Sequence, residues 1–342
     1  MHTLTDAHKN ALTLWLQTQG LPPTTVIEAE PLSGGASRDT WRLKLQGPDF
    51  TLEQVMRRDL PTQMFDEALT RAQEFHIMRV AHDHGVKVAR MTYLCEDPGV
   101  LGSPFFLMDY VRGVSIGTKV IHAPELAAAR ERLPQQLAEQ LALIHRLPMD
   151  ELDFLPRAPE GVPYGRYVVD QMYALLDKLD VHNPVWEWAL RWAQNHLPAQ
   201  TRTTVIHGDF RIGNVLVDEQ GLAAVIDWEF AHIGDPHEEM GYICMRDWRF
   251  GAIDRHFGGL ADRETFLTAY ETASGVAVDR QAVDWWEVMG NIRWGIICMS
   301  QANRHLSGLE PSVELASLGR RSAEMQLETL RLIERIGSAE LR

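Results

Sequence analysis

Apolar and polar positions alternate with two different periods along this chain of 342 residues. In the first third, Trp41, Leu43 and Leu45 alternate with polar residues, which is the pattern of a half-buried strand. The stretch FTLEQVMRR (50–58) predicts a second strand, and ARMTYLCED and GSPFFLMDYV predict the two strands of a hairpin. Two helices are expected here, one over about 5–19 and one over 66–85, which Gly85 would end.

Beyond about residue 113 the apolar residues follow the period of helices instead. We expect helices over 125–147, 164–180, 184–197, 263–274, 279–304 and 311–336. The only clear strand pair in this part is NVLVDEQGLAAVIDW, with DEQG as its turn. The pattern predicts an α+β chain: a small β-rich lobe with a helix (1–112), a hinge at 109–113, and a larger, mainly helical lobe (113–342).

Composition adds limits on the class of protein. Apolar residues make up 45% and charged residues 23%, as in soluble globular proteins. A net charge of −14 disfavours nonspecific binding to nucleic acid or anionic membranes, and no apolar stretch is long enough to span a bilayer. The first residues are typical of a short amphipathic helix rather than a signal peptide. Three widely spaced cysteines without pairing or metal-ligand spacing favour a reducing cytoplasm. The oligomeric state cannot be read from the sequence.

The stretch VIHGDFRIGNVLVDEQGLAAVIDWE (205–229) concentrates the candidate chemistry. Asp209 lies in a loop after an apolar strand, and Asn214 follows five residues later at the start of the next strand. Asp227 ends the partner strand, so antiparallel pairing would bring it to Asn214. Asp209 could then accept a proton from an acceptor hydroxyl, while Asn214 and Asp227 hold Mg²⁺ through oxygen atoms. His207 would hold the loop by a hydrogen bond to the Asp227 region.

The alternative is a hairpin whose Asp and Asn residues only bond to the local backbone. That explanation suits each residue alone, but it does not account for His-Gly-Asp, the asparagine and the distal aspartate together. The spacing therefore favours a site for phosphoryl transfer.

These residues also carry a resemblance to a known family. HGDFRIGNVLV followed by VIDWE resembles the catalytic and metal-binding segments of aminoglycoside phosphotransferases and choline kinases, which belong to the protein-kinase-like superfamily. IDWEFAHIGDPHEEMG resembles a subgroup related to the kinase-like domain of acyl-CoA dehydrogenase fusion proteins. That subgroup usually has GDP-x-x-D, and Glu239 replaces its last aspartate here. The resemblance covers nearly the whole chain and implies a bilobal kinase-like fold.

The resemblance also implies a nucleotide site for ATP or GTP with Mg²⁺. LSGGASRDTWRL would be the glycine-rich turn, in which Gly34 and Gly35 allow close approach to the phosphates and Ser37 donates to a phosphate oxygen. The segment PFFLMDYVRG would be the hinge. There, adenine would bind to main-chain groups of Asp109, Tyr110 and Val111.

A basic residue on the third strand and a glutamate on the next helix complete this expected site. Arg57 stands where kinases have the strand lysine, and Arg58 would point to the opposite face. We favour Arg57, although a pair of solvated arginines is the alternative. Glu74 is the expected partner, with Glu67 as the alternative.

The acceptor is the least determined part of the prediction. Trp248 and Arg249 lie soon after the metal-binding segment and could touch an acceptor that carries carboxylate or phosphate. A structural ion pair is the equal alternative for Arg249.

The sequence thus predicts an ATP-dependent (or GTP-dependent) O-phosphotransferase acting on a small-molecule hydroxyl. Choline-like, sugar, homoserine-like and hydroxyacyl acceptors stay open beside aminoglycosides. A protein kinase is disfavoured because no activation-loop-like stretch or A-P-E segment follows Asp227. A non-catalytic, nucleotide-binding pseudokinase is disfavoured by the three intact polar residues of the loop and hairpin.

Overall fold

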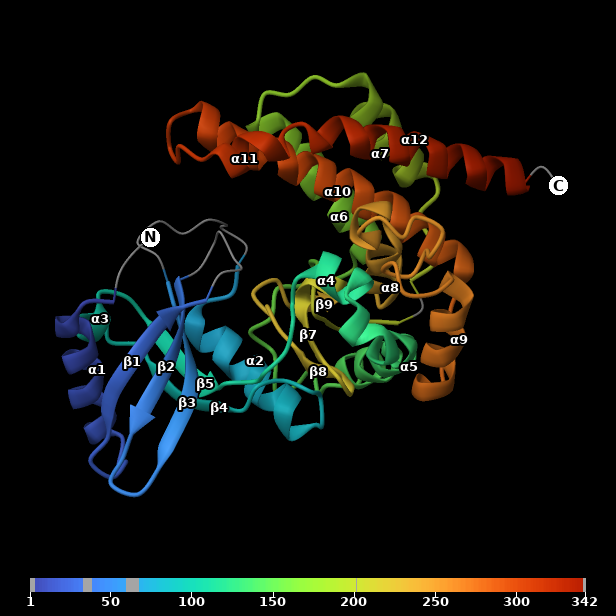
Figure 1. Ribbon diagram of the computed structural model, residues 1–342. Helices are drawn as coiled ribbons and strands as arrows, with labels where there is room; N and C mark the ends of the chain where they lie inside the picture. The colour runs from blue at the N-terminus through green and yellow to red at the C-terminus, as the bar shows by residue number, and fades with distance from the viewer. Residues whose placement is uncertain (1–3, 33–38, 60–67, 201, 341–342) are drawn as a thin grey trace.

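The computed structural model describes residues 4–32, 39–59, 68–200 and 202–340. The chain forms a bilobal, kinase-like structure, with a β-sheet lobe on one side and a mainly helical lobe on the other (Figure 1). Gly34, Gly35, Ser37 and Glu67 lie outside the described residues.

The N-terminal lobe is built on a five-stranded antiparallel sheet in the order β1-β2-β3-β5-β4. Its strands are β1 (Thr25–Pro31), β2 (Asp39–Gln46), β3 (Thr51–Arg58), β4 (Met91–Cys95) and β5 (Phe105–Asp109). As the alternation predicted, Trp41, Leu43 and Leu45 of β2 are all buried. They belong to one apolar cluster with Leu12 and Leu16 of helix α1 (Asp6–Thr18), so α1 and the sheet bury each other's apolar residues.

The other helix of this lobe, α2 (Arg71–Asp83), begins later than the pattern predicted. Thr70 caps it in a capping box with Gln73, and this hydrogen bonding sets the first turn at Arg71 rather than near Asp66. The predicted hairpin of β4 and β5 is present and contains a short helix, α3 (Pro98–Leu101), in its connection.

Helices dominate the C-terminal lobe, as expected. They are α4 (Gly117–His122), α5 (Ala127–Ile144), α6 (Tyr164–Lys178), α7 (Pro184–Asn195), α8 (His237–Cys244), α9 (Arg263–Ser274), α10 (Arg280–Leu306), α11 (Val313–Leu318) and α12 (Arg321–Glu340). The single helix predicted over 311–336 is wrong, because the chain turns between α11 and α12. Gly319 lies in that turn, where a Cβ atom would come within 2.8 Å of Ala302 Cβ on α10. Close packing against α10 therefore favours glycine at the position where the chain turns.

Two small antiparallel strand pairs lie between these helices. One is the predicted hairpin of β7 (Val215–Asp218) and β8 (Gly221–Val225). The other joins β6 (Thr204–Ile206) to β9 (His232–Gly234), so the hairpin is not the only strand pair of this lobe. Each strand of this second pair has three residues, which is too short for alternation to identify a pair.

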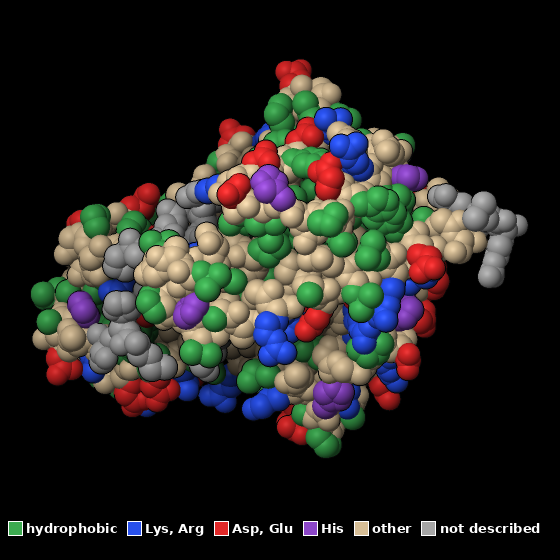
Figure 2. All heavy atoms as spheres, turned by 90° about the horizontal axis from the view of Figure 1, so that it is seen from above, with side chains coloured by type: hydrophobic (Ala, Val, Ile, Leu, Met, Phe, Trp, Pro, Cys, Tyr) green, Lys and Arg blue, Asp and Glu red, His purple; other side chains and the backbone are tan. Residues whose placement is uncertain are grey.

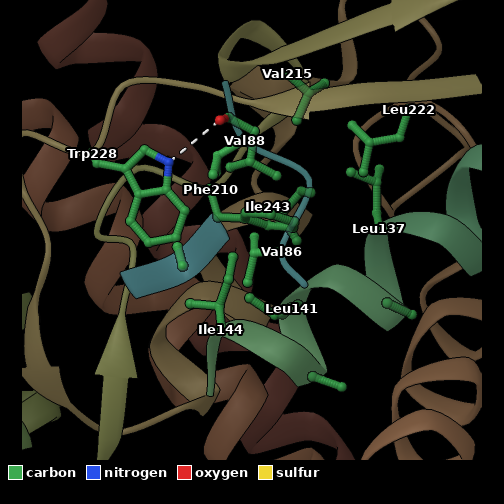
Figure 3. Close-up of a cluster of buried hydrophobic side chains, with 14 of the residues drawn as sticks. Val86, Val88, Leu137, Leu141, Ile144, Phe210, Val215, Leu222, Trp228 and Ile243 are labelled. Carbon is green, nitrogen blue, oxygen red and sulfur yellow. Dashed lines mark hydrogen bonds between the residues drawn. The ribbon is translucent and has the colours of Figure 1, made fainter. Parts of the chain in front are cut away.

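The candidate site rests on the main apolar core of the molecule. Phe210 follows Asp209, Trp228 follows Asp227, and both aromatic side chains are buried. Figure 3 shows them packed with Val215, Ile243 and other apolar side chains, where Trp228 Nε1 donates to Val225 O at 3.3 Å. The apolar neighbours thus fix the backbone of two polar residues of the candidate site.

Charged side chains of both signs are interspersed over the face seen from above (Figure 2). The three cysteines, Cys95, Cys244 and Cys298, are buried and unpaired, as expected. Within the described ranges, no helix combines the length and the apolar character that crossing a membrane requires.

Candidate active site

The loop that carries Asp209 leaves β6 through a backbone conformation that requires glycine. Gly208 has a φ of +86°, and a Cβ atom on it would lie 2.2 Å from Phe230 O. His207 fixes the loop from the other side. Its Nδ1 accepts from Asp209 N at 3.3 Å, and its Nε2 donates to Ile226 O at 3.0 Å. This is the bond to the Asp227 region that the sequence suggested for His207.

Glu239 on α8 holds the same loop through main-chain bonds that the sequence did not predict. Its Oε1 accepts from the amides of His207 at 3.1 Å and Gly208 at 3.2 Å. Its Oε2 lies 3.0 Å from His145 Nε2, and His145 Nδ1 lies 2.8 Å from the Tyr270 hydroxyl. The motif pointed to the acidic position, but only the fold shows that it supports the Asp209 loop.

Asp209 is half-buried and surrounded by donors. Asn214, at the end of the short 3-10 helix η2 (Ile212–Asn214), donates through Nδ2 to Asp209 O at 3.0 Å and also to its carboxylate. Arg211 Nε donates to Asp209 Oδ1 at 2.9 Å. Burial and then the Asp209 carboxylate raise the pKa of the Tyr242 hydroxyl well above its usual range. The sequence did not single out Arg211 or Tyr242.

The β7–β8 hairpin brings Asp227 beside Asn214, as predicted. Ile226 N donates to Asn214 O at 3.0 Å, and Asp227 is the next residue. Asp227 has a φ of +70°, a conformation that costs free energy in a non-glycine residue and is typical of functional sites. Its Oδ1 accepts from Arg57 at 2.9 Å. Burial alone would raise the pKa of this carboxyl, but Arg57 lowers it below its ordinary value.

Arg57 connects the two lobes at the site. It donates to Glu74 Oε1 at 2.7 Å as well as to Asp227, and Glu74 is also paired with Arg71. Burial alone would lower the pKa of Arg57, but the surrounding carboxylates raise it above its usual value. Arg58 points to the other face of β3, where its Nε donates to Asp39 at 3.1 Å. The structure thus brings Arg57, Glu74 and Asp227 together and directs Arg58 away.

The expected hinge follows β5 and joins the lobes. Asp109 N donates to Arg90 O at 2.9 Å, and Tyr110 N donates to Glu53 O at 3.2 Å. Among the described residues, no main-chain partner is found for Val111 N.

Of the two expected acceptor-binding residues, one lines a cavity. Trp248, in the 3-10 helix η3 (Arg246–Arg249), lines a cavity of about 740 Å³ and lies 4.6 Å under the guanidinium of Arg211. Arg249 is buried away from that cavity. It donates to Cys244 O at 2.8 Å and pairs with Glu287 at 3.3 Å, which is the structural alternative for this residue.

This arrangement of lobes, loop and hairpin is that of the protein-kinase-like fold, and solved structures of that fold match it over most of the chain. One of them, from Ralstonia eutropha JMP134 and provisionally named an aminoglycoside phosphotransferase, has a TM-score of 0.75 and 22% identity over 95% of this chain and 98% of that one. A Plasmodium vivax ethanolamine kinase gives a TM-score of 0.61 and 13% identity over 91% of this chain and 85% of that one. A spectinomycin phosphotransferase solved with ADP and spectinomycin gives 0.61 and 13% identity over 94% and 98%.

The family follows from the sequence itself. Residues 28–286 match the profile of the phosphotransferase enzyme family (APH), and the chain belongs to that family. Mouse acyl-CoA dehydrogenase family member 10 is 28% identical over 230 residues, which are 66% of this chain and 21% of that protein. Acyl-CoA dehydrogenase family member 11 from Pongo abelii is 27% identical over 303 residues, which are 81% of this chain and 38% of that protein. The chain therefore spans well under half the length of these curated relatives.

Proposed function

We propose that this protein transfers the γ-phosphoryl group of ATP (or GTP) to a hydroxyl group of a small molecule. The observation that carries the proposal is the meeting of Asp209, Asn214 and Asp227 at one loop and hairpin, with Arg57 and Glu74 reaching the same point from the other lobe. Phosphoryl transfer needs positioning and charge compensation more than covalent help from the protein, and these residues supply both.

The proposed reaction forms a bond between the acceptor oxygen and the γ-phosphorus while the bond to the β–γ bridging oxygen breaks. Asp209 orients the acceptor hydroxyl and takes its proton, which then passes to solvent. The products are a phosphate ester and the nucleoside diphosphate. Arg57 would compensate charge on the nucleotide phosphates, and its Nε is buried with no partner among the described residues. Val111 N would donate to the base.

The residues present also fit a magnesium ion. Asp227 offers a carboxylate, and Asn214 directs Nδ2 to Asp209, which leaves Oδ1 for a cation. Mg²⁺ takes few protein oxygens and completes its ligands with phosphate and water. Consistent with so sparse a donor set, no group of three or more His, Cys, Asp or Glu that could hold a metal occurs in the described part. When bound, the ion would neutralise charge on the phosphates.

Two assays test this function together. Thermal stability is measured with ATP and with GTP, each with magnesium or with a chelator, because a ligand that binds the folded state raises the unfolding temperature. Candidate alcohols, including aminoglycosides, choline-like, sugar and hydroxyacyl compounds, are then screened for acceptor-dependent release of nucleoside diphosphate. We expect magnesium-dependent stabilisation and release with at least one class. Stabilisation without any transfer would instead indicate a non-catalytic nucleotide-binding protein.

A further inference from the structure

A second, smaller cavity of about 130 Å³ opens between α6, β9 and α10. Its polar lining comes from Arg157, Tyr164, Tyr167, Gln171, His232 and Arg293. None of the nine described residues that line it is an aspartate or a glutamate. Such a lining is unusual in a chain with a net charge of −14, so its charge calls for an explanation.

Arg157 brings to this cavity a positive charge that no carboxylate of the described residues compensates. Arg157 is exposed, and within the described residues its guanidinium bonds only to main-chain carbonyls, the nearest being Asp153 O at 2.9 Å. Arg293 pairs with Glu238 at 2.7 Å, but that buried carboxylate also serves His232 at 3.1 Å. Glu238 is therefore shared by Arg293 and His232, and Arg157 adds a positive group that has no carboxylate partner among the described residues.

This cavity lies next to the Asp209 loop. Phe230, which also lines it, has its carbonyl packed against Gly208, the residue before Asp209. In the β6–β9 strand pair, His232 lies opposite Ile206, and Ile206 is three residues before Asp209 in the sequence. A further small recess is lined by both Arg293 and Tyr242, and Tyr242 interacts with the Asp209 carboxylate. The small cavity and the Asp209 loop are therefore neighbours in the fold, and Phe230 contacts both.

The larger cavity beside Trp248 differs in its charge balance. Its lining holds three arginines and three acids, and these residues pair with one another: Arg246 with Glu328 at 2.8 Å, Arg331 with Glu328 at 2.9 Å, and Arg321 with Asp247 and Glu324. Its charges are satisfied internally, so it offers no comparable preference for an anion.

We infer that the cavity lined by Arg157, Arg293 and Tyr167 binds an anionic group, carboxylate or phosphate, on the small molecule whose hydroxyl is phosphorylated at Asp209. This inference rests on the proposed function. Arginines are suited to carboxylates and phosphates because the guanidinium donates two parallel hydrogen bonds. A polycationic acceptor is disfavoured, because it would meet like charges there.

The test compares acceptors of matched length and different charge. Short-chain hydroxyalkanoates, the corresponding singly phosphorylated diols, the neutral hydroxy amides and the amino alcohols are assayed with the wild-type protein for acceptor-dependent ADP release. We expect kcat/KM for one anionic class to exceed that of the neutral and cationic acceptors by about 10- to 100-fold. The class that prevails tells carboxylate from phosphate. Neutral or cationic acceptors that work as well would overturn the inference and leave the proposed function standing.

Arg157→Gln is the informative variant, because its side chain is exposed and pairs with no carboxylate of the described residues. Its kcat/KM for the anionic acceptor should fall about tenfold through KM, with the neutral acceptor unchanged. Arg191 is an exposed arginine of α7 that pairs with Glu187 on the same helix, so Arg191→Gln is the matched control and should change neither value. Equal losses for all acceptors in Arg157→Gln would contradict a charge-selective site. Calorimetric titration of the hydroxyalkanoates and phosphorylated diols into both variants separates the two hypotheses. Binding that depends on Arg157 without phosphoryl transfer contradicts only the proposed function, and absence of anion binding overturns the inference.

Discussion

The two sides of Asp209 are built differently. On the nucleotide side, the cationic groups are buried and paired: Arg57 with Glu74 and Asp227, and Arg71 with Glu74. On the proposed acceptor side, Arg157 is exposed. Among the described residues it has no carboxylate partner, and none of those that line its small cavity is an aspartate or a glutamate. A closed network of charges suits a constant ligand such as a nucleotide, whereas an uncompensated patch suits the ligand that distinguishes one family member from another. The predictions below test this contrast.

The largest expected effect comes from the residue between the two sides. Asp209→Asn removes the proton acceptor but retains the shape of the side chain. We expect turnover to fall by roughly 10²- to 10⁴-fold, while the stabilisation by magnesium nucleotide changes little. The measurement is acceptor-dependent ADP release beside a thermal-shift titration. Unchanged turnover in this variant would contradict the role given to Asp209.

The next effect separates two neighbouring buried arginines of β3. Arg57→Met leaves Glu74 and Asp227 without this cation, and Arg58→Met leaves Asp39 without its partner. Each loss should destabilise the fold by roughly 1–3 kcal/mol, because a carboxylate loses a hydrogen-bonding cation. Chemical denaturation measures that common effect.

Nucleotide affinity should distinguish these two variants. Arg57→Met should weaken binding of ATP at least about tenfold, the scale of a lost hydrogen bond to a charged group. Arg58→Met, which points to the other face, should leave the affinity within about twofold. If both variants lost the same affinity for ATP, the face of β3 that carries Arg57 would have no specific role in binding the phosphates.

A smaller effect is expected from the support of the Asp209 loop. Glu239→Ala removes the acceptor of the His207 and Gly208 amides, so the loop loses its fixed position. We expect kcat to fall about 10- to 100-fold, the cost of slight misplacement of a catalytic group, with KM for ATP little changed. Glu219→Ala, in the exposed turn of the β7–β8 hairpin, is the control. A loss confined to KM would argue against a positioning role.

The smallest effect is a difference between two buried histidines in the pH dependence of stability. Burial lowers the pKa of His145, so just below its ordinary value of about 6.5 the unfolded chain binds more protons and stability rises with pH. For His232 burial alone would lower the pKa, but Glu238 raises it above the ordinary value. Its contribution to stability is therefore present below about pH 6.5 and lost as the pH rises through the higher folded pKa.

Replacing each histidine with glutamine should alter the pH slope of the free energy of unfolding in opposite directions. In His145→Gln, the slope of the free energy of unfolding against pH should become less positive just below pH 6.5. In His232→Gln, the same slope should become less negative just above pH 6.5. Each change should be smaller than about 1.4 kcal/mol per pH unit. Denaturant titrations at a series of pH values measure both slopes. Changes of the same sign would contradict the opposite pKa shifts.

The sequence predicted the nucleotide side better than the acceptor side for a physical reason. Asp209, Asn214 and Asp227 lie within one loop and one hairpin, so short-range spacing places them together. Arg57 and Arg58 were separated by strand alternation alone. These local rules determine positions without knowledge of the fold.

The acceptor side depends on contacts between distant segments. Arg157, His232 and Arg293 come together from three separate elements, and no periodicity indicates that they do so. Tertiary packing also determines where Arg249 points, because its buried guanidinium donates to Cys244 O and pairs with Glu287.

Transfer of label from ATP labelled on its γ-phosphate tests the central claim most directly. The protein is incubated with magnesium, labelled ATP and the acceptor that best stimulates ADP release, and the acceptor is recovered and analysed for phosphate. The account predicts a labelled phosphate ester with the wild-type chain and none with Asp209→Asn. Label found only in free phosphate, or equal labelling of the acceptor by both proteins, would contradict it.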